Sequence, residues 1–273
     1  MTTLMGQPAA TPQSHSANHP GVNAAAPTPA VANLQFRVSI NRRWPAQRLG
    51  LPPVEKRWAR YNSSFRAEEH TPESLLMEVA RGYAFTAVLG GCGGLCCGTW
   101  CTNSEHASIS GHCGRPHGYR LNRHFVSAQF IAADFDTGDE RSSFGYLLQQ
   151  PLIAQHGTFL YTTLSHSPQH PKARAVFITD GPFTDARHYR RAKLAVMESL
   201  SWSDASVHDP CRVFYGTHPE RGQTHYQGRM LPPSMVDELI KTFRAKLKAA
   251  QECRKLPWIP SSRVMGTTPA AEV

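Results

Sequence analysis

The sequence lacks several features that would each point to a particular class of protein. No apolar run approaches the roughly 20 residues of a membrane-spanning helix, and the N-terminus has no charged-then-apolar signal pattern. No internal repeat occurs, and no GxxxxGK[ST] string marks a P-loop of the kind that helicases carry. These absences argue against a membrane protein, a secreted protein and a helicase, so we expect a cytoplasmic protein.

Acidic residues are also scarce. The 273 residues hold 20 Asp and Glu against 29 Lys and Arg, a formal net charge of +9. This excess favours a polyanionic partner, with nucleic acid first, although simple solubility is the alternative explanation. A hydrophobic content of 40% is enough for a core in one large domain or two small ones.

Composition divides the chain into a folded centre and two tails. Residues 1–33 are rich in Ala, Pro, Ser and Thr, which cannot bury a core, so we expect a disordered tail there. We expect a second flexible tail at residues 256–273 and a catalytic domain at residues 34–255.

Within this domain, helix and strand patterns alternate. Thr71, Pro72 and Glu73 supply an N-cap, a proline at the first helical position and an early acid, which predicts a helix ending near Gly82. Other helices are predicted at 142–150, from a Thr184 cap to about 200, and at 234–254. Strands are predicted at 85–89, 125–135, 158–164, 173–179 and 211–215. This order predicts an α+β fold with a mostly antiparallel sheet flanked by helices.

Two acids follow the apolar run Phe130 to Ala133. Because side chains alternate along a strand, Asp134 and Asp136 point to the same face, while Phe135 points to the other. Two carboxylates so close repel each other unless a positive charge lies between them, and hard oxygen ligands suit Mg²⁺ or Mn²⁺. The alternative is a strand that simply ends in an acidic, solvated turn.

Two later stretches, SHSPQHPKARAVF at residues 165–177 and SDASVHDPCRVFYG at residues 203–216, add basic groups and a third acid. Together with the acid pair and the run DTGDERSSFGYLLQQPLI, they resemble the catalytic core of the archaeo-eukaryotic primase superfamily. The greatest likeness is to primase-polymerase domains of plasmids, phages and other mobile elements, over roughly residues 75–230. The resemblance implies a two-layer primase-polymerase core and a template-dependent nucleotidyltransferase.

The resemblance also implies roles for single residues. Two Mg²⁺ or Mn²⁺ ions would be held by Asp134, Asp136 and Asp204. The nucleotide would be bound by Ser165, His166, Lys172, Arg174 and Arg212. In many members the motif histidine lies within the return strand, whereas here that strand carries Lys172 and Arg174. Either His166 or Arg174 therefore takes the basic role, and a salt bridge to the acids is the alternative for Arg174 and Arg212.

A Cys/His-rich loop at residues 90–124 is read as an insertion. It has more ligands than one tetrahedral zinc needs, but no pair has CxxC spacing. Because a long polar loop is costly to order without a staple, we expect one structural Zn²⁺. Its candidate ligands are Cys92, Cys97, Cys101, Cys113, His106, His112 and His117. A merely mobile Gly-rich loop is the alternative.

Basic and aromatic residues interleave in two segments near the N-terminus, where cations can pair with phosphates while rings stack on bases. The candidates for nucleic-acid contact are Arg42, Arg43, Trp44, Lys56, Arg57, Trp58 and Arg60. Ordinary packing with extended Arg side chains is an equally good explanation. The predicted C-terminal helix also has a basic face, for which solvation is the more common explanation.

The sequence therefore predicts a DNA primase or primase-polymerase of a mobile element, associated with the nucleoid. Its partners would be single-stranded DNA template, nucleotides and a helicase on a separate chain. Two alternatives stay open. His166, His170 and Asp134 could serve a metal-dependent rolling-circle initiator or nuclease with Tyr189 as nucleophile, although His-x-His spacing is absent. The other is a non-enzymatic, zinc-dependent DNA-binding protein.

Overall fold

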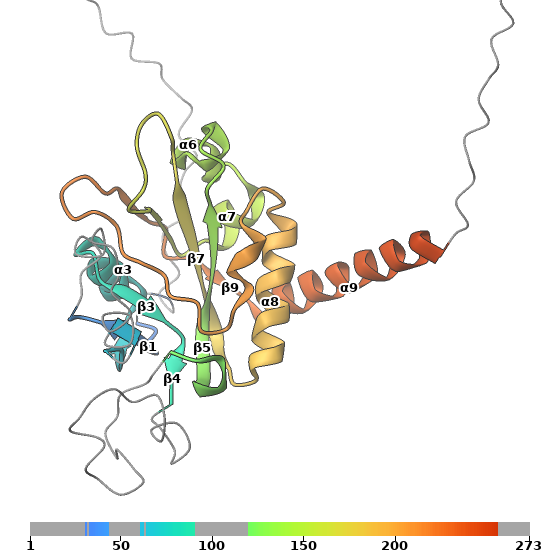
Figure 1. The fold of residues 1–273 in the computed structure, drawn as a ribbon, viewed down its shortest axis with the longest axis horizontal. Helices are drawn as coiled ribbons and strands as arrows, with labels where there is room; N and C mark the ends of the chain where they lie inside the picture. The colour runs from blue at the N-terminus through green and yellow to red at the C-terminus, as the bar shows by residue number, and fades with distance from the viewer. Residues whose placement is uncertain (1–30, 32, 44–60, 63, 91–119, 256–273) are drawn as a thin grey trace, which may run out of the picture.

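A large twisted sheet runs through the centre of the molecule, with helices on one face and a smaller sheet on the other (Figure 1). The computed structural model describes residues 31, 33–43, 61–62, 64–90 and 120–255. The combination of antiparallel strands and separate helices confirms the α+β prediction. No helix in these ranges is long and apolar enough to cross a membrane.

The large sheet has six strands in the order β4-β5-β7-β6-β8, with β9 pairing with β7 in parallel and all other pairs antiparallel. These strands are β4 (Val88–Leu89), β5 (Phe125–Phe135), β6 (Phe159–Thr162), β7 (Ala173–Phe183), β8 (Thr224–Tyr226) and β9 (Met230–Leu231). The two long strands, β5 and β7, lie side by side at the centre, so residues at their ends are fixed by many ladder hydrogen bonds.

The small sheet is antiparallel in the order β2-β1-β3. Its strands are β1 (Phe36–Asn41), β2 (Arg66–His70) and β3 (Ala84–Thr86). Segment 85–89, predicted as one strand, is thus divided between the two sheets, with β3 in the small sheet and β4 in the large one.

The described helices surround the sheets. They are α3 (Pro72–Ala80), α6 (Phe144–Leu147), α7 (Pro151–His156), α8 (Ala186–Ser199) and α9 (Pro233–Lys255), with 3₁₀ turns η2 (Asn122–His124), η3 (Glu140–Ser142) and η4 (Ala205–His208). Helix α3 confirms the capping prediction: the Thr71 hydroxyl accepts from the Ser74 amide, Pro72 is the first residue, and Gly82 follows the end with a φ of 88°.

Two apolar clusters form on opposite faces of the large sheet. On one face, Ile131, Ala133 and Phe135 of β5 pack with residues of α8 and α9. On the other face, Phe130 and Ala132 pack against the small sheet and α3. Asp134 follows Phe130 and Ala132 in this alternation, so it points toward the side of the small sheet.

Two predicted elements are wrong. The helix expected at 142–150 is interrupted, because Ser143 caps the short α6 and Pro151 begins a separate helix, α7. The strand expected at 211–215 is only an isolated bridge between Phe214 and Phe85 of β3. Here the Asp209 carboxylate accepts from the Cys211 amide, and the Arg212 amide donates to the Asp209 carbonyl, so a local turn takes the hydrogen bonds that a strand would need.

Candidate functional site

The two acids lie where β5 ends, beside the first residues of β7. In the β5–β7 ladder Asp134 is directly opposite Arg174, and the same register places Asp136 opposite Lys172 just beyond the strand ends. Side chains opposite each other in an antiparallel pair are close neighbours on one face. The register therefore gives each acid its own basic partner on the adjacent strand.

Arg174 and Asp134 form a buried ion pair. The Arg174 Nε and Nη2 donate to the two carboxylate oxygens of Asp134, with 2.9 Å between Nη2 and Oδ2. The Arg174 Nη1 donates to the Tyr161 hydroxyl at 2.6 Å and to the Tyr215 carbonyl at 3.0 Å. Its guanidinium carbon also lies 4.9 Å from the centre of the Phe214 ring. Only 7% of the Arg174 side chain and 13% of the Asp134 side chain are exposed.

Electrostatics keep this arginine charged in spite of its burial. Burial lowers the pKa of the Arg174 guanidinium, but the charge of Asp134 and the hydrogen bonds to Asp134 and Tyr161 together raise it above its ordinary value. Burial also raises the pKa of Tyr161, which stays a neutral phenol. The Arg174 guanidinium is thus a charged group held beneath the surface.

The second pair is accessible. The Lys172 Nζ lies 2.5 Å from the Asp136 Oδ1, and 53% of the Asp136 side chain is exposed. The Lys172 side chain is less exposed, at 26%, and a partly solvated Lys–Asp contact contributes little to stability. Asp136 is therefore the more accessible acid of the pair Asp134 and Asp136.

The third predicted acid lies beside the first through the backbone. The Asp204 amide donates to the Asp134 carbonyl at 2.8 Å. The Asp204 carboxylate caps η4, accepting from the Ser206 amide at 2.8 Å and the Ser206 hydroxyl at 2.7 Å. Asp204 thus lies beside the end of β5, and its carboxylate is bonded to Ser206.

The turn between β6 and β7 carries the predicted Ser165 and His166. Ser165 is exposed, while the His166 Nδ1 accepts from the Lys172 amide at 3.1 Å. Burial lowers the pKa of His166 below its ordinary value, so the ring is neutral at pH 7. His166 thus positions the backbone of Lys172, and that contact leaves the Nε2 atom to interact elsewhere.

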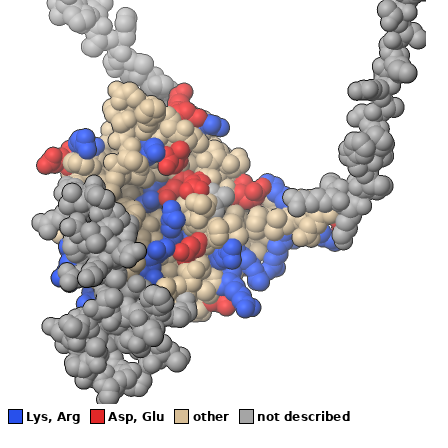
Figure 2. Space-filling view, viewed as in Figure 1, with Lys and Arg blue, Asp and Glu red and all other residues tan. Residues whose placement is uncertain are grey.

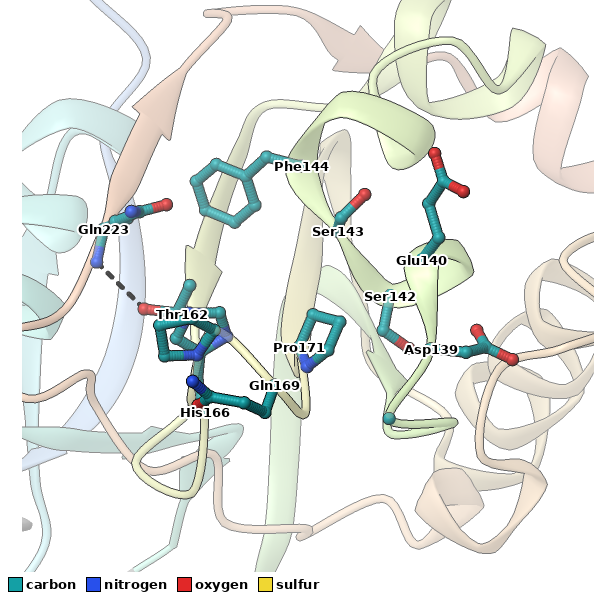
Figure 3. A pocket seen from close by; sticks show the side chains of 12 residues that line it. Asp139, Glu140, Ser142, Ser143, Phe144, Thr162, His166, Gln169, Pro171 and Gln223 are labelled. Atoms are coloured by element: carbon teal, nitrogen blue, oxygen red, sulfur yellow. Dashed lines mark hydrogen bonds between the residues drawn. The ribbon is translucent and has the colours of Figure 1, made fainter.

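A pocket of about 510 Å³ opens next to these residues, between the turn of β6–β7 and the loop that follows Asp136 (Figure 3). Its lining includes His166, Thr162, Phe144 and Gln223, and the Thr162 hydroxyl accepts from the Gln223 amide at 2.9 Å. Gly138, with a φ of 71°, allows the tight turn from Asp136 into the pocket wall. The size falls within the range of small-ligand sites.

The remaining predicted cation, Arg212, is half-buried in the segment after η4. The nearby Asp209 pairs with Arg120, with 3.0 Å between Arg120 Nη2 and Asp209 Oδ2. The Lys193 Nζ, fully buried on α8, donates to the Asp209 carbonyl at 2.7 Å. Burial lowers the pKa of Lys193 to about 7.

Carboxylates are the type of ligand that a divalent metal prefers, but the carboxylates of Asp134, Asp136 and Asp204 are each bonded to another residue of the protein. No set of three or more His, Cys, Asp or Glu side chains is grouped as a metal site within the described ranges. Arg174 occupies one acceptor position on each Asp134 oxygen, and a carboxylate has further lone pairs. Lys172 contacts only the Oδ1 atom of Asp136, so both carboxylates keep acceptor positions for a further ligand.

Other predicted residues are placed elsewhere or lie outside the described residues. Arg42 pairs with Glu68 at 2.8 Å and Glu78 at 2.5 Å, which favours the packing alternative over phosphate contact. Arg43 is exposed. Outside the described residues lie Trp44, Lys56, Arg57, Trp58, Arg60 and all seven candidate zinc ligands.

The alternative nucleophile does not lie at a surface. Tyr189 is fully buried, its ring stacks on Phe125 at 5.5 Å, and burial raises its pKa well above the ordinary value. A neutral, buried phenol cannot attack a DNA phosphate, so the rolling-circle alternative loses its nucleophile.

Sequence reasoning missed several members of the site. Gln223 pairs with Thr162 across 61 residues, and the Tyr215 carbonyl holds Arg174 across 41. Gln223 belongs to no recognisable motif, whereas Tyr215 lies in the string RVFYG at the end of the stretch 203–216.

Comparisons with known proteins give little. No protein-family model matches the sequence, and no curated protein matches it. Among solved structures, the chain is similar to the AEP domain of the primase-polymerase (PrimPol) of cyanophage S-2L. The identity is 12% and the TM-score 0.37, over 77% of this chain and 90% of that chain. Values this low do not establish a shared function.

Proposed function

We propose that this chain is a nucleotidyltransferase of the primase or primase-polymerase kind, adding nucleotides on a single-stranded template in the replication of a mobile element. The observation that carries the proposal is the pairing of Asp134 and Asp136 with Arg174 and Lys172 at the end of β5, next to a pocket of nucleotide size. The resemblance of the three sequence stretches to the primase superfamily supports the same reaction class.

In this proposal the acids and bases have separate tasks. Asp134, Asp136 and Asp204 would hold divalent metal ions, which when bound neutralise the triphosphate and stabilise the attacking and leaving oxygens. Lys172, whose ammonium contacts Asp136, would bind a phosphate of the nucleotide. His166, Ser165 and Arg212 are the other proposed nucleotide contacts, since each lies on the turn or segment near the acids.

Arg174 is proposed to position Asp134 rather than to bind the nucleotide directly. Four of its five N–H groups already donate to protein acceptors, and its side chain is almost completely buried. This leaves the basic role at the nucleotide to His166 and Lys172.

The test is incorporation of labelled nucleotides by the full chain on single-stranded DNA, with and without primer, in Mg²⁺ or Mn²⁺. Asp136→Ala should abolish incorporation and leave the unfolding midpoint nearly unchanged, because the exposed pair adds little stability. Asp180→Ala, an exposed acid near the other end of β7, is the matched control and should keep full activity. A wild-type protein that incorporates nothing, or an active Asp136→Ala variant, would remove the proposal.

A further inference from the structure

The outer face of α8 and α9 is strongly basic. These two helices hold ten Lys and Arg against four Asp and Glu, a net charge of +6 out of the +9 of the whole chain. Among the ten, only Lys193 is buried within the described side chains. Figure 2 shows Lys and Arg gathered over the region where α8 and α9 meet.

The basic side chains form one stripe on each helix. On α8 the spacing of Arg187, Arg190 and Arg191 places them on one exposed side. On α9 the spacing of Lys241, Arg244 and Lys248 does the same. The two helices lie against each other, and Ala192, Ala195 and Val196 of α8 share one apolar cluster with Val236 and Ile240 of α9, so the two stripes are carried by neighbouring helices.

Most of these cations have no acidic partner. Within the part of the chain that the structure describes, no ion pair is formed by Arg187, Arg190, Arg191, Lys241 or Arg244. By contrast, the Lys246 Nζ on another side of α9 pairs with Glu198 at 3.1 Å. Like charges left unpaired on adjacent helices repel each other and attract a polyanion.

The C-terminal half of α9 is a second feature that favours a polyanionic partner. Every residue from Arg244 to Glu252 is exposed, and this half of the helix projects from the domain (Figure 1). A short stretch of isolated helix is only marginally stable in water. Neutralisation of its basic stripe by phosphates would stabilise it.

We propose that this face of α8 and α9 binds the phosphate backbone of double-stranded nucleic acid without reading its sequence. Single strands are normally held by exposed aromatic rings, and no large aromatic side chain is exposed in the described ranges. The arginines of the α8 stripe lie in the first half of that helix, which follows the end of β7 opposite to Arg174.

The test is fluorescence anisotropy of a labelled 20-base-pair duplex with the full chain, without nucleotide or divalent metal, between about 50 and 200 mM salt. Four phosphate contacts give a log–log salt slope of about −3.6, which is a roughly 150-fold loss of affinity over this range. Arg187→Gln with Arg191→Gln, and Lys241→Gln with Arg244→Gln, should each reduce the slope by about 2. Lys246→Gln is the matched control, because its charge is already paired.

Two duplexes of unrelated sequence should bind equally, and a 20-nucleotide single strand more weakly. Wild-type slopes in both double variants, with unchanged circular dichroism, would overturn the proposal, as would an equal loss in Lys246→Gln. Asp136→Ala should bind the duplex like wild type, so a failure of catalysis and a failure of this surface give different results.

Discussion

The buried pair of Arg174 and Asp134 allows a quantitative test of what holds the site together. Replacing Arg174 by Met leaves Asp134 without its cation in a largely buried position and removes the donor to the Tyr161 hydroxyl. Breaking a buried ion pair from one side costs about 3–5 kcal/mol. Because domains are stable by only about 5–15 kcal/mol, this single change should remove a large part of the free energy of unfolding.

A double-mutant cycle separates the pair from its surroundings. Arg174→Met, Asp134→Asn and the double variant are compared by urea unfolding at pH 7. We expect the double variant to be less destabilised than the sum of the single variants by about 2 kcal/mol, because the second change removes a charge that the first leaves unpaired.

The exposed pair of Arg141 and Asp139 is the matched control. It has the same two residue types, with 2.7 Å between Arg141 Nη2 and Asp139 Oδ2, but 52% and 45% of the side chains are exposed. The same cycle there should give no measurable coupling. Additive effects at Arg174 and Asp134, or equal coupling at both pairs, would refute the view that the buried pair is a structural anchor.

Three further results are expected. His166→Asn keeps an acceptor for the Lys172 amide but lacks the Nε2 atom. It should lower kcat/KM at least about tenfold without changing stability, because one charge-assisted contact to the nucleotide is lost. Full activity of this variant would mean that the His166 ring only stabilises the turn between β6 and β7. Burial lowers the pKa of Lys193 from 10.5 to about 7, so above pH 7 the unfolded chain binds more protons than the folded one. The free energy of unfolding should therefore rise by about 2 kcal/mol between pH 7 and 9, and Lys193→Met should lose this rise in urea unfolding at both pH values; an identical rise in the variant would contradict the assignment. Elemental analysis of protein purified without chelator should find close to one zinc per chain, lost in Cys101→Ser and Cys113→Ser, because a long polar loop with five cysteines is costly to order without metal. A zinc-free wild-type protein would mean that the loop is a mobile insertion without metal.

Short sequence patterns predicted those features of the structure that depend on neighbouring residues in the chain. Side-chain alternation placed Asp134 and Asp136 on one face, and capping chemistry located the start of α3 at Thr71. The basic partners were also expected to approach the acids, since the salt-bridge alternative for Arg174 is the contact that the structure contains.

Long-range pairing could not be predicted in the same way. The strand β2 has the polar sequence RAEEH, which carries no apolar alternation, because among the described residues it is an edge strand that pairs with β1 alone. Conversely, the β-rich string at 211–215 forms only one bridge, because its neighbouring hydrogen bonds are taken by Asp209. The pocket wall at Gln223 depends on the pairing of β6 with β8, which no short motif encodes.

The bridge at Phe214 has a mechanical consequence. The Phe214 amide and carbonyl bond Phe85 of the small sheet at 2.8 and 2.9 Å, and the carbonyl of the next residue, Tyr215, holds Arg174 in the large sheet. One short segment is therefore a rigid link between the two sheets, attached at its end to the partner of Asp134. A rotation of one sheet relative to the other would therefore move the Arg174 guanidinium and change the position of the Asp134 carboxylate. Substitutions in the packing of β3 should for this reason alter the site from a distance, without contact to any of its charged groups.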